Sequence, residues 1–284
     1  MEELLEGIVE VIEDIMYTLF GGGIWYESSI IVWNLVISLI SSLMGYTPED
    51  FSPEAWSYTV NTVYSFMLSI GALMLNLMYM AGLIRHCTNL KDNLTLEIVL
   101  DGLIKIMLSN FLMLNGLPLM KSVFRISAYM SKGFLSTDSL TFRSLDMDIS
   151  SVMFMHSLGI LYFIVSIVCA GLIFVSVYGR YLHLYALVGI APIAWATIPG
   201  GHGISNSASA WLRTFLAKTF ESVIISIFIG IAGKLCENID FGKIETEWFI
   251  GNGMIQLIQN MAVMILLAAA VKGCEQFLRR AMAL

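Results

Sequence analysis

The sequence predicts an all-α protein, a polytopic bundle of transmembrane helices. Of its 284 residues, 57% are hydrophobic and only 13% are charged, and the mean hydropathy is +0.79. Soluble domains carry about a quarter charged residues, so this chain has too few to cover a water-facing surface. Its apolar stretches are long and continuous, whereas the strands of a membrane barrel alternate over about ten residues. Lipid is therefore the expected solvent for most of the chain.

The first part of the chain, residues 1–46, is expected to be an amphipathic and interfacial region ahead of a transmembrane domain at 47–284. In residues 1–20, apolar side chains recur at helical spacing opposite a row of glutamates, and three glycines at 21–23 end the predicted amphipathic helix. Residues 24–44 are apolar but thinned by a glutamate and several serines. This stretch is marginal as a span, and we favour an interfacial or partner-packed helix over a crossing.

Five later stretches are apolar over about the 20 residues that one crossing requires. The first follows two helix starts, Thr47-Pro48 and Ser52-Pro53, in which a hydroxyl cap precedes a proline at the first helical position. Asn115-Gly116-Leu117-Pro118 is expected to end the second. We expect about five spans, at 55–84, 94–117, 152–178, 211–235 and 254–271.

Basic residues at three span ends predict the orientation, because Lys and Arg concentrate in short cytoplasmic loops. Arg85 follows the first span, Arg180 the third, and Arg279-Arg280 the fifth. The expectation is a multi-pass protein of the cytoplasmic (inner) membrane, with its N-terminus outside and its C-terminus in the cytoplasm. In this arrangement the basic stretch at 121–132 lies outside.

Residues 184–198 form one further apolar stretch, which is short and interrupted by Gly189 and Pro192. It cannot also cross without inverting everything after it, so we expect it to be re-entrant or to lie at the cytoplasmic face. Backbone without full helical hydrogen bonding is tolerated at membrane depth only where protein or water borders it. A ring of identical subunits would supply that shelter, and we therefore expect a homo-oligomer.

Two pairs of opposite charges fall inside predicted spans. Asp101 and Lys105 are spaced i, i+4, and Lys218 and Glu221 are spaced i, i+3, so each pair shares one face of a helix. Charges inside a bilayer normally face the protein interior or water. The pattern leaves two interpretations open: the pairs line a polar conduit, or they neutralise each other where helices pack.

The chain carries none of the motifs by which catalytic or metal sites are recognised from sequence. HExxH, GxSxG and the Walker glycine loop are absent, and the four cysteines are scattered. We therefore expect no catalysis, no cofactor and no metal.

One region resembles a known family. Residues 185–194 read Tyr-Ala-Leu-Val-Gly-Ile-Ala-Pro-Ile-Ala, and after a polar turn Ala210-Trp211-Leu212-Arg213 opens a membrane helix. An apolar segment with a central GxAPI sequence followed by Trp-Leu-Arg resembles the TrbL-like family, the polytopic inner-membrane subunit of conjugative type IV secretion systems. The similarity covers about 55–284 and is strongest over 150–270. A short loop at 118–150, where many members carry a large one, is more like versions from Gram-positive bacteria.

The resemblance implies a membrane-embedded structural or channel subunit that moves DNA or protein across the cytoplasmic membrane without catalysis. Its implied partners are other secretion-system subunits, including separate ATPases, further copies of itself, membrane lipid, and the DNA or protein in transit. A secondary transporter and a scaffold of another multisubunit membrane complex remain open as alternatives. The candidate conduit or packing residues are Asp101, Lys105, Gly189, Pro192, Trp211, Arg213, Lys218 and Glu221.

Overall fold

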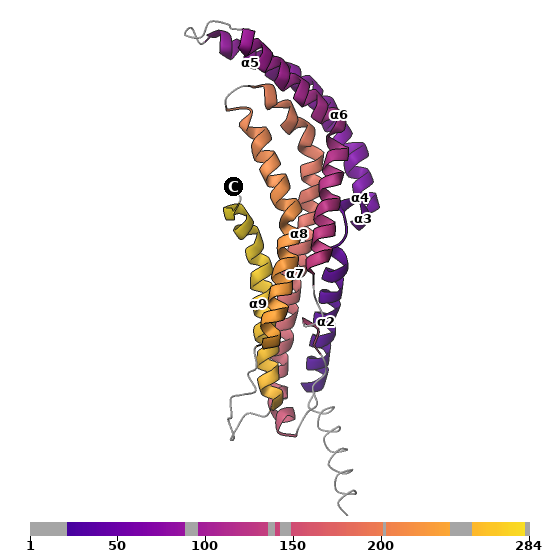
Figure 1. The fold of residues 1–284 in the computed structure, drawn as a ribbon. Helices are drawn as coiled ribbons and strands as arrows, with labels where there is room; N and C mark the ends of the chain where they lie inside the picture. The colour runs from indigo at the N-terminus through magenta and orange to yellow at the C-terminus, as the bar shows by residue number, and fades with distance from the viewer. Residues whose placement is uncertain are drawn as a thin grey trace, which may run out of the picture. The chain divides into compact units, whose positions relative to one another are not determined.

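The computed structural model describes residues 22–88, 96–135, 140–142, 149–200, 203–238 and 252–281. Every regular element in these ranges is a helix (Figure 1), which confirms the all-α class. The amphipathic helix predicted at 1–20 lies outside the described residues. In chain order the helices are α2 (Gly22–Leu43), α3 (Pro48–Phe51), α4 (Pro53–Tyr58), the π-helix η1 (Thr59–Tyr64), α5 (Ser65–Thr88), α6 (Leu96–Phe134), α7 (Ile149–Ala196), the 3₁₀-helix η3 (Ile198–Gly200), α8 (Asn206–Asn238) and α9 (Asn252–Ala281).

Six stretches of helix among the described residues are long and apolar enough to cross a membrane. Five of them overlap the predicted spans, and the sixth covers most of the marginal stretch at 24–44. The chain is therefore a polytopic membrane protein. The six stretches are Trp25–Leu43, Pro53–Ile84, Val99–Phe134, Leu158–Ala196, Asn206–Leu235 and Leu257–Cys274.

Three helices are much longer than one crossing requires. Helices α6, α7 and α8 contain 39, 48 and 33 residues. At a rise of 1.5 Å per residue their lengths are about 58, 72 and 50 Å. The hydrocarbon core of a bilayer is about 30 Å thick. A part of each of these helices must therefore extend beyond the hydrocarbon.

The helix end predicted at Pro118 and the helix interruption predicted at Pro192 are not present. Helix α6 continues through Pro118, and α7 continues through Pro192, so residues 184–196 are the end of α7 and not a separate interrupted segment. A proline in a helix removes one N–H donor and crowds one carbonyl. Pro192 is buried and lies close to Gly71 of α5, whereas Pro118 is exposed. Arg180, expected at a span end, accordingly lies in the interior of α7.

The chain folds as two compact units, each assembled from segments that are separate in sequence. The first contains residues 1–44, 134–177 and 224–274; the second contains 45–133, 178–223 and 275–284. The later segments of the first unit are distant in sequence from its first segment, so sequence order alone does not group them.

In the first unit, α2 packs in the core. Its buried side chains recur every three or four residues and include Tyr26, Trp33 and Ile37. The Trp33 indole N–H donates to the Leu140 carbonyl at 2.9 Å, and the Ser166 hydroxyl of α7 donates to the Ser29 carbonyl at 3.0 Å. These two hydrogen bonds fix α2 against segments more than a hundred residues away.

In the second unit, the short segment 46–52, which contains α3, is held against α7 by aromatic side chains. Phe51 stacks on Tyr181 with ring centroids 3.9 Å apart. The hydroxyl of Tyr181 donates to the Tyr46 carbonyl at 3.1 Å, and the hydroxyl of Tyr185 donates to the Pro48 carbonyl at 2.8 Å. These contacts hold this segment against α7.

Candidate functional site

The end of α7, which carries the Gly189 and Pro192 pattern, is enclosed by helices of the same chain. Val188, Ala191 and Ala196 are each 0% exposed. A Cβ at Gly71 of α5 would lie 2.9 Å from the Pro192 carbonyl oxygen. Backbone thus approaches backbone directly. The expectation that one subunit offers this segment little shelter is wrong, because its own helices supply it.

Two other glycines show the same close approach. A Cβ at Gly82 of α5 would overlap the Pro199 carbonyl oxygen, and a Cβ at Gly189 would lie 2.8 Å from a methyl of Val63 in η1. Small residues at such points let helices of membrane proteins pack at short range. Gly189 is a packing position on a continuous helix and not a hinge between two segments.

Trp211 joins the start of α8 to the end of α7. Its indole N–H donates to the Leu187 carbonyl at 3.0 Å. Its ring meets that of Trp195 edge-on at 5.5 Å and stacks on Phe215 at 5.2 Å. The two parts of the sequence that carry the family resemblance therefore contact each other. Arg213, the remaining residue of the Trp-Leu-Arg opening, has an exposed side chain.

Helix α6 contacts the end of α7 through Trp195. The Ser109 hydroxyl donates to the Trp195 carbonyl at 2.5 Å. The ring of Trp195 covers Gly116 so closely that a Cβ there would overlap the nearest ring carbon. The prediction that residues 115–118 end the helix was wrong. Gly116 lies inside α6, and its lack of a side chain makes room for the Trp195 ring.

The two charged pairs differ in their surroundings. Lys218 Nζ lies 3.2 Å from Glu221 Oε2, and the two side chains are only 10% and 7% exposed. Lys105 Nζ lies 2.5 Å from Asp101 Oδ2, with exposures of 39% and 56%. The predicted pairing occurs in both, but only Lys218 and Glu221 are buried within the chain.

Sequence reasoning missed a set of hydroxyl groups between α6 and α8. The Ser127 hydroxyl donates to the Thr219 carbonyl at 2.6 Å and lies 3.1 Å from the Ser222 hydroxyl. All three residues are buried, beside the stretch of α8 that carries Lys218 and Glu221. The available signal was the i, i+4 spacing of Ser127 and Ser131, in the stretch 121–132 that was predicted to lie outside the spans.

Two basic residues also have partners that the sequence did not indicate. Lys121 pairs with Glu49 at 2.9 Å and lies over the Trp56 ring, 5.5 Å from its centroid. Arg180 is only 4% exposed, and its guanidinium lies 4.5 Å from the ring centroid of Tyr181. Arg180 is therefore a buried cation inside α7 and not a loop residue.

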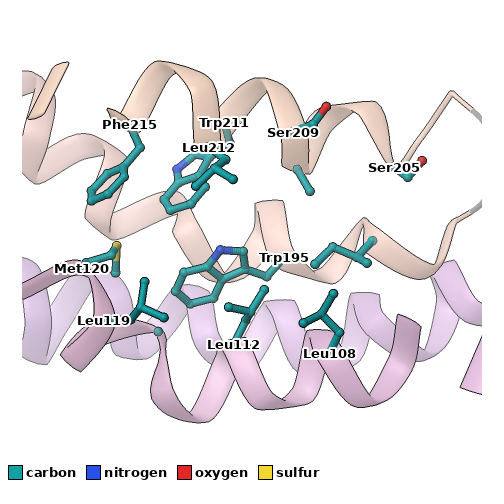
Figure 2. Close-up of a pocket in the computed structure, with 13 residues that line it drawn as sticks. Leu108, Leu112, Leu119, Met120, Trp195, Ser205, Ser209, Trp211, Leu212 and Phe215 are labelled. Atoms are coloured by element: carbon teal, nitrogen blue, oxygen red, sulfur yellow. The ribbon is translucent and has the colours of Figure 1, made fainter. Parts of the chain in front are cut away.

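An apolar slot with a volume of about 440 Å³ lies between α6 and the aromatic side chains of α7 and α8 (Figure 2). Leucines of α6 form one wall, and Trp195, Trp211 and Phe215 belong to the other. Among the described residues, no group of three His, Cys, Asp or Glu side chains is placed to hold a metal ion. Comparisons with protein-family models, curated proteins and solved structures found no match to this chain.

Proposed function

We propose that this protein is a non-enzymatic subunit of a type IV secretion machine, embedded in the cytoplasmic membrane and taking part in conjugative transfer of DNA or protein. Its N-terminus is outside and its C-terminus is in the cytoplasm. It works as a homo-oligomer together with other secretion subunits and separate ATPases. The resemblance of residues 185–194 and 210–213 to the TrbL-like family supports this proposal, and Trp211 of the second stretch donates a hydrogen bond to Leu187 of the first.

The observation that most favours a subunit over a free-standing protein is the apolar surface of α7. Exposed apolar side chains on this helix run from Ile160, which is 46% exposed, to Ile190, which is 45% exposed. These positions are about 45 Å apart along the axis. To fit within about 30 Å of hydrocarbon, the helix would need a tilt of about 48°, beyond the roughly 40° upper end of observed tilts. We propose that other protein covers part of this surface.

Gene deletion tests the proposal. Removing the gene should abolish conjugative transfer from donor cells, and supplying it in trans should restore transfer. Ile190→Asp should insert normally, because the spanning helices are unchanged, and should lose transfer, because it places a charge on the surface proposed to contact other subunits. Ile190→Leu is the matched control. Wild-type transfer by Ile190→Asp, with normal insertion, would exclude this surface from the machine.

A secondary transporter is the second candidate, and one observation favours it. The buried Lys218 and Glu221 lie next to a row of hydroxyl groups within the α8 span, and intramembrane charges mark ion or substrate paths in transporters. For a transporter, deleting the gene would leave conjugation unchanged while abolishing uptake or efflux of a solute. The deletion experiment therefore separates the two functions.

A further inference from the structure

The two ends of the apolar slot in the second unit differ in polarity. At one end, Ser205 and Ser209 lie at the start of α8 (Figure 2). At the other end, Met120 and Phe215 close it with apolar side chains. Ser205 belongs to the turn that precedes the α8 span. The slot thus runs from a polar chain turn into the membrane-spanning part of the protein.

Contacts of Trp195 and Trp211 keep the slot from collapsing. The Trp195 ring cannot sink further toward α6, since it already lies against Gly116. Its other face is limited by Trp211, which is itself held by the hydrogen bond to the Leu187 carbonyl. A rigid aromatic wall opposite the leucines of α6 therefore leaves a space that the protein's own side chains do not fill.

The surroundings determine what can occupy this space. An apolar cavity of this kind excludes water, because water would find too few polar partners there. Leaving it empty would deprive its lining of dispersion contacts. Its lining comes from α6, from the end of α7 with η3, and from the start of α8, and these three α-helices are long and apolar enough to cross a membrane. Membrane lipid is therefore the nearest apolar ligand. Pockets of about 300–1,000 Å³ hold ligands of moderate size, and 440 Å³ suits a single hydrocarbon chain.

We propose that the slot binds one acyl chain of a membrane phospholipid, with the headgroup next to Ser205 and Ser209 and the chain end next to Met120 and Phe215. The bound chain fills the contact between α6 and the Trp195–Trp211 pair. This inference requires only that the chain spans a membrane, and it does not depend on the proposed role in secretion.

Substitutions on α8 test the proposal. Ala208 lines the slot, whereas Ala210 on the same helix is exposed and lies outside it. The full chain, purified in detergent, should retain about one phospholipid per molecule in native mass spectrometry, as expected for a pocket of this size. Ala210→Trp should retain the same amount, and Ala208→Trp, which fills the slot, should retain at least about tenfold less. Equal retention by both variants, or none by the wild type, would overturn the proposal.

A second measurement uses the wild-type chain and avoids any effect of substitution on folding. Phosphatidylcholine with a photoreactive diazirine at the end of one acyl chain is incorporated into vesicles with the protein. Crosslinks should concentrate on Met120, Phe215 and Leu119. Crosslinks at outward-facing positions such as Leu114, which is 80% exposed, with none in the slot, would refute binding. Crosslinks at Ser205 and Ser209 alone would refute the proposed direction of the chain.

Discussion

Two ion pairs of the same kind have different energetic roles because of their burial. Lys218 and Glu221 are about nine-tenths buried, whereas Asp101 and Lys105 are each more than a third exposed. An exposed pair gains little, since solvent competes for both charges. A buried pair gains little over an apolar replacement, but loss of one partner leaves an uncompensated charge. Both pairs join a lysine to a carboxylate, and the surroundings decide the cost of changing them.

The first prediction compares one and two substitutions at the buried pair. Lys218→Ala should lower the free energy of unfolding by about 3–5 kcal/mol, because it removes the cation next to the buried Glu221 carboxylate. The double change Lys218→Ala with Glu221→Ala should recover most of that loss. Equilibrium unfolding in mixed micelles measures both.

The exposed pair supplies the control. Replacing Asp101 and Lys105 together by alanine should change the free energy of unfolding by no more than about 1 kcal/mol. If Lys218→Ala and the double variant at Lys218 and Glu221 were equally impaired, mutual neutralisation would not be the reason that the buried pair is there.

At the scale of elements, the second unit is assembled through points where a helix presents no side chain. Gly71 and Gly82 of α5 both lie against carbonyl groups of residues 192–199, and Gly116 of α6 lies against Trp195. At Gly71 and Gly82 the neighbouring group is a backbone carbonyl, which no side-chain rotation can move, whereas at Gly116 it is an indole ring. A methyl group added on α5 is therefore accommodated only if a backbone segment shifts.

The second prediction follows from this difference. Gly82→Ala should lower the free energy of unfolding by about 1–3 kcal/mol, because its Cβ would overlap the Pro199 carbonyl oxygen and force the helices apart. Gly133→Ala in α6 is the matched control, since a Cβ there meets nothing within 4 Å. The control should be neutral or more stable by up to about 1 kcal/mol, as alanine favours helix over glycine. Equal thermal stability of the two variants would argue against close packing at Gly82.

At the scale of the whole molecule, the number of apolar helices that cross the membrane sets the positions of the two termini. Residues 25–43 of α2 are just long enough to cross, and 39% of this stretch is buried inside the chain. If α2 does not cross, five crossings place the two termini on opposite sides of the membrane. If it does, six crossings place them on the same side.

The third prediction takes the five-crossing orientation that we propose. In a cysteine-free background, Glu2→Cys and Leu145→Cys should react with an impermeant maleimide from outside. Met282→Cys should react only after the membrane is permeabilised. Protection of Glu2→Cys, with Leu145→Cys still labelled, would mean that α2 crosses; protection of both with free labelling of Met282→Cys would invert the orientation.

The sequence by itself determined that the protein is all-helical and polytopic, and it located the five main apolar stretches and both charged pairs. These properties depend on composition and on residues three or four apart, which a helix brings together wherever it lies. The tertiary structure decided the rest. Pro118 and Pro192 lie inside continuous helices, and Pro192 lies against Gly71 of α5, a contact that the local sequence does not reveal. Gly116 lies against Trp195 of α7, a contact between two helices that the local sequence does not reveal, and Arg180 is buried inside α7.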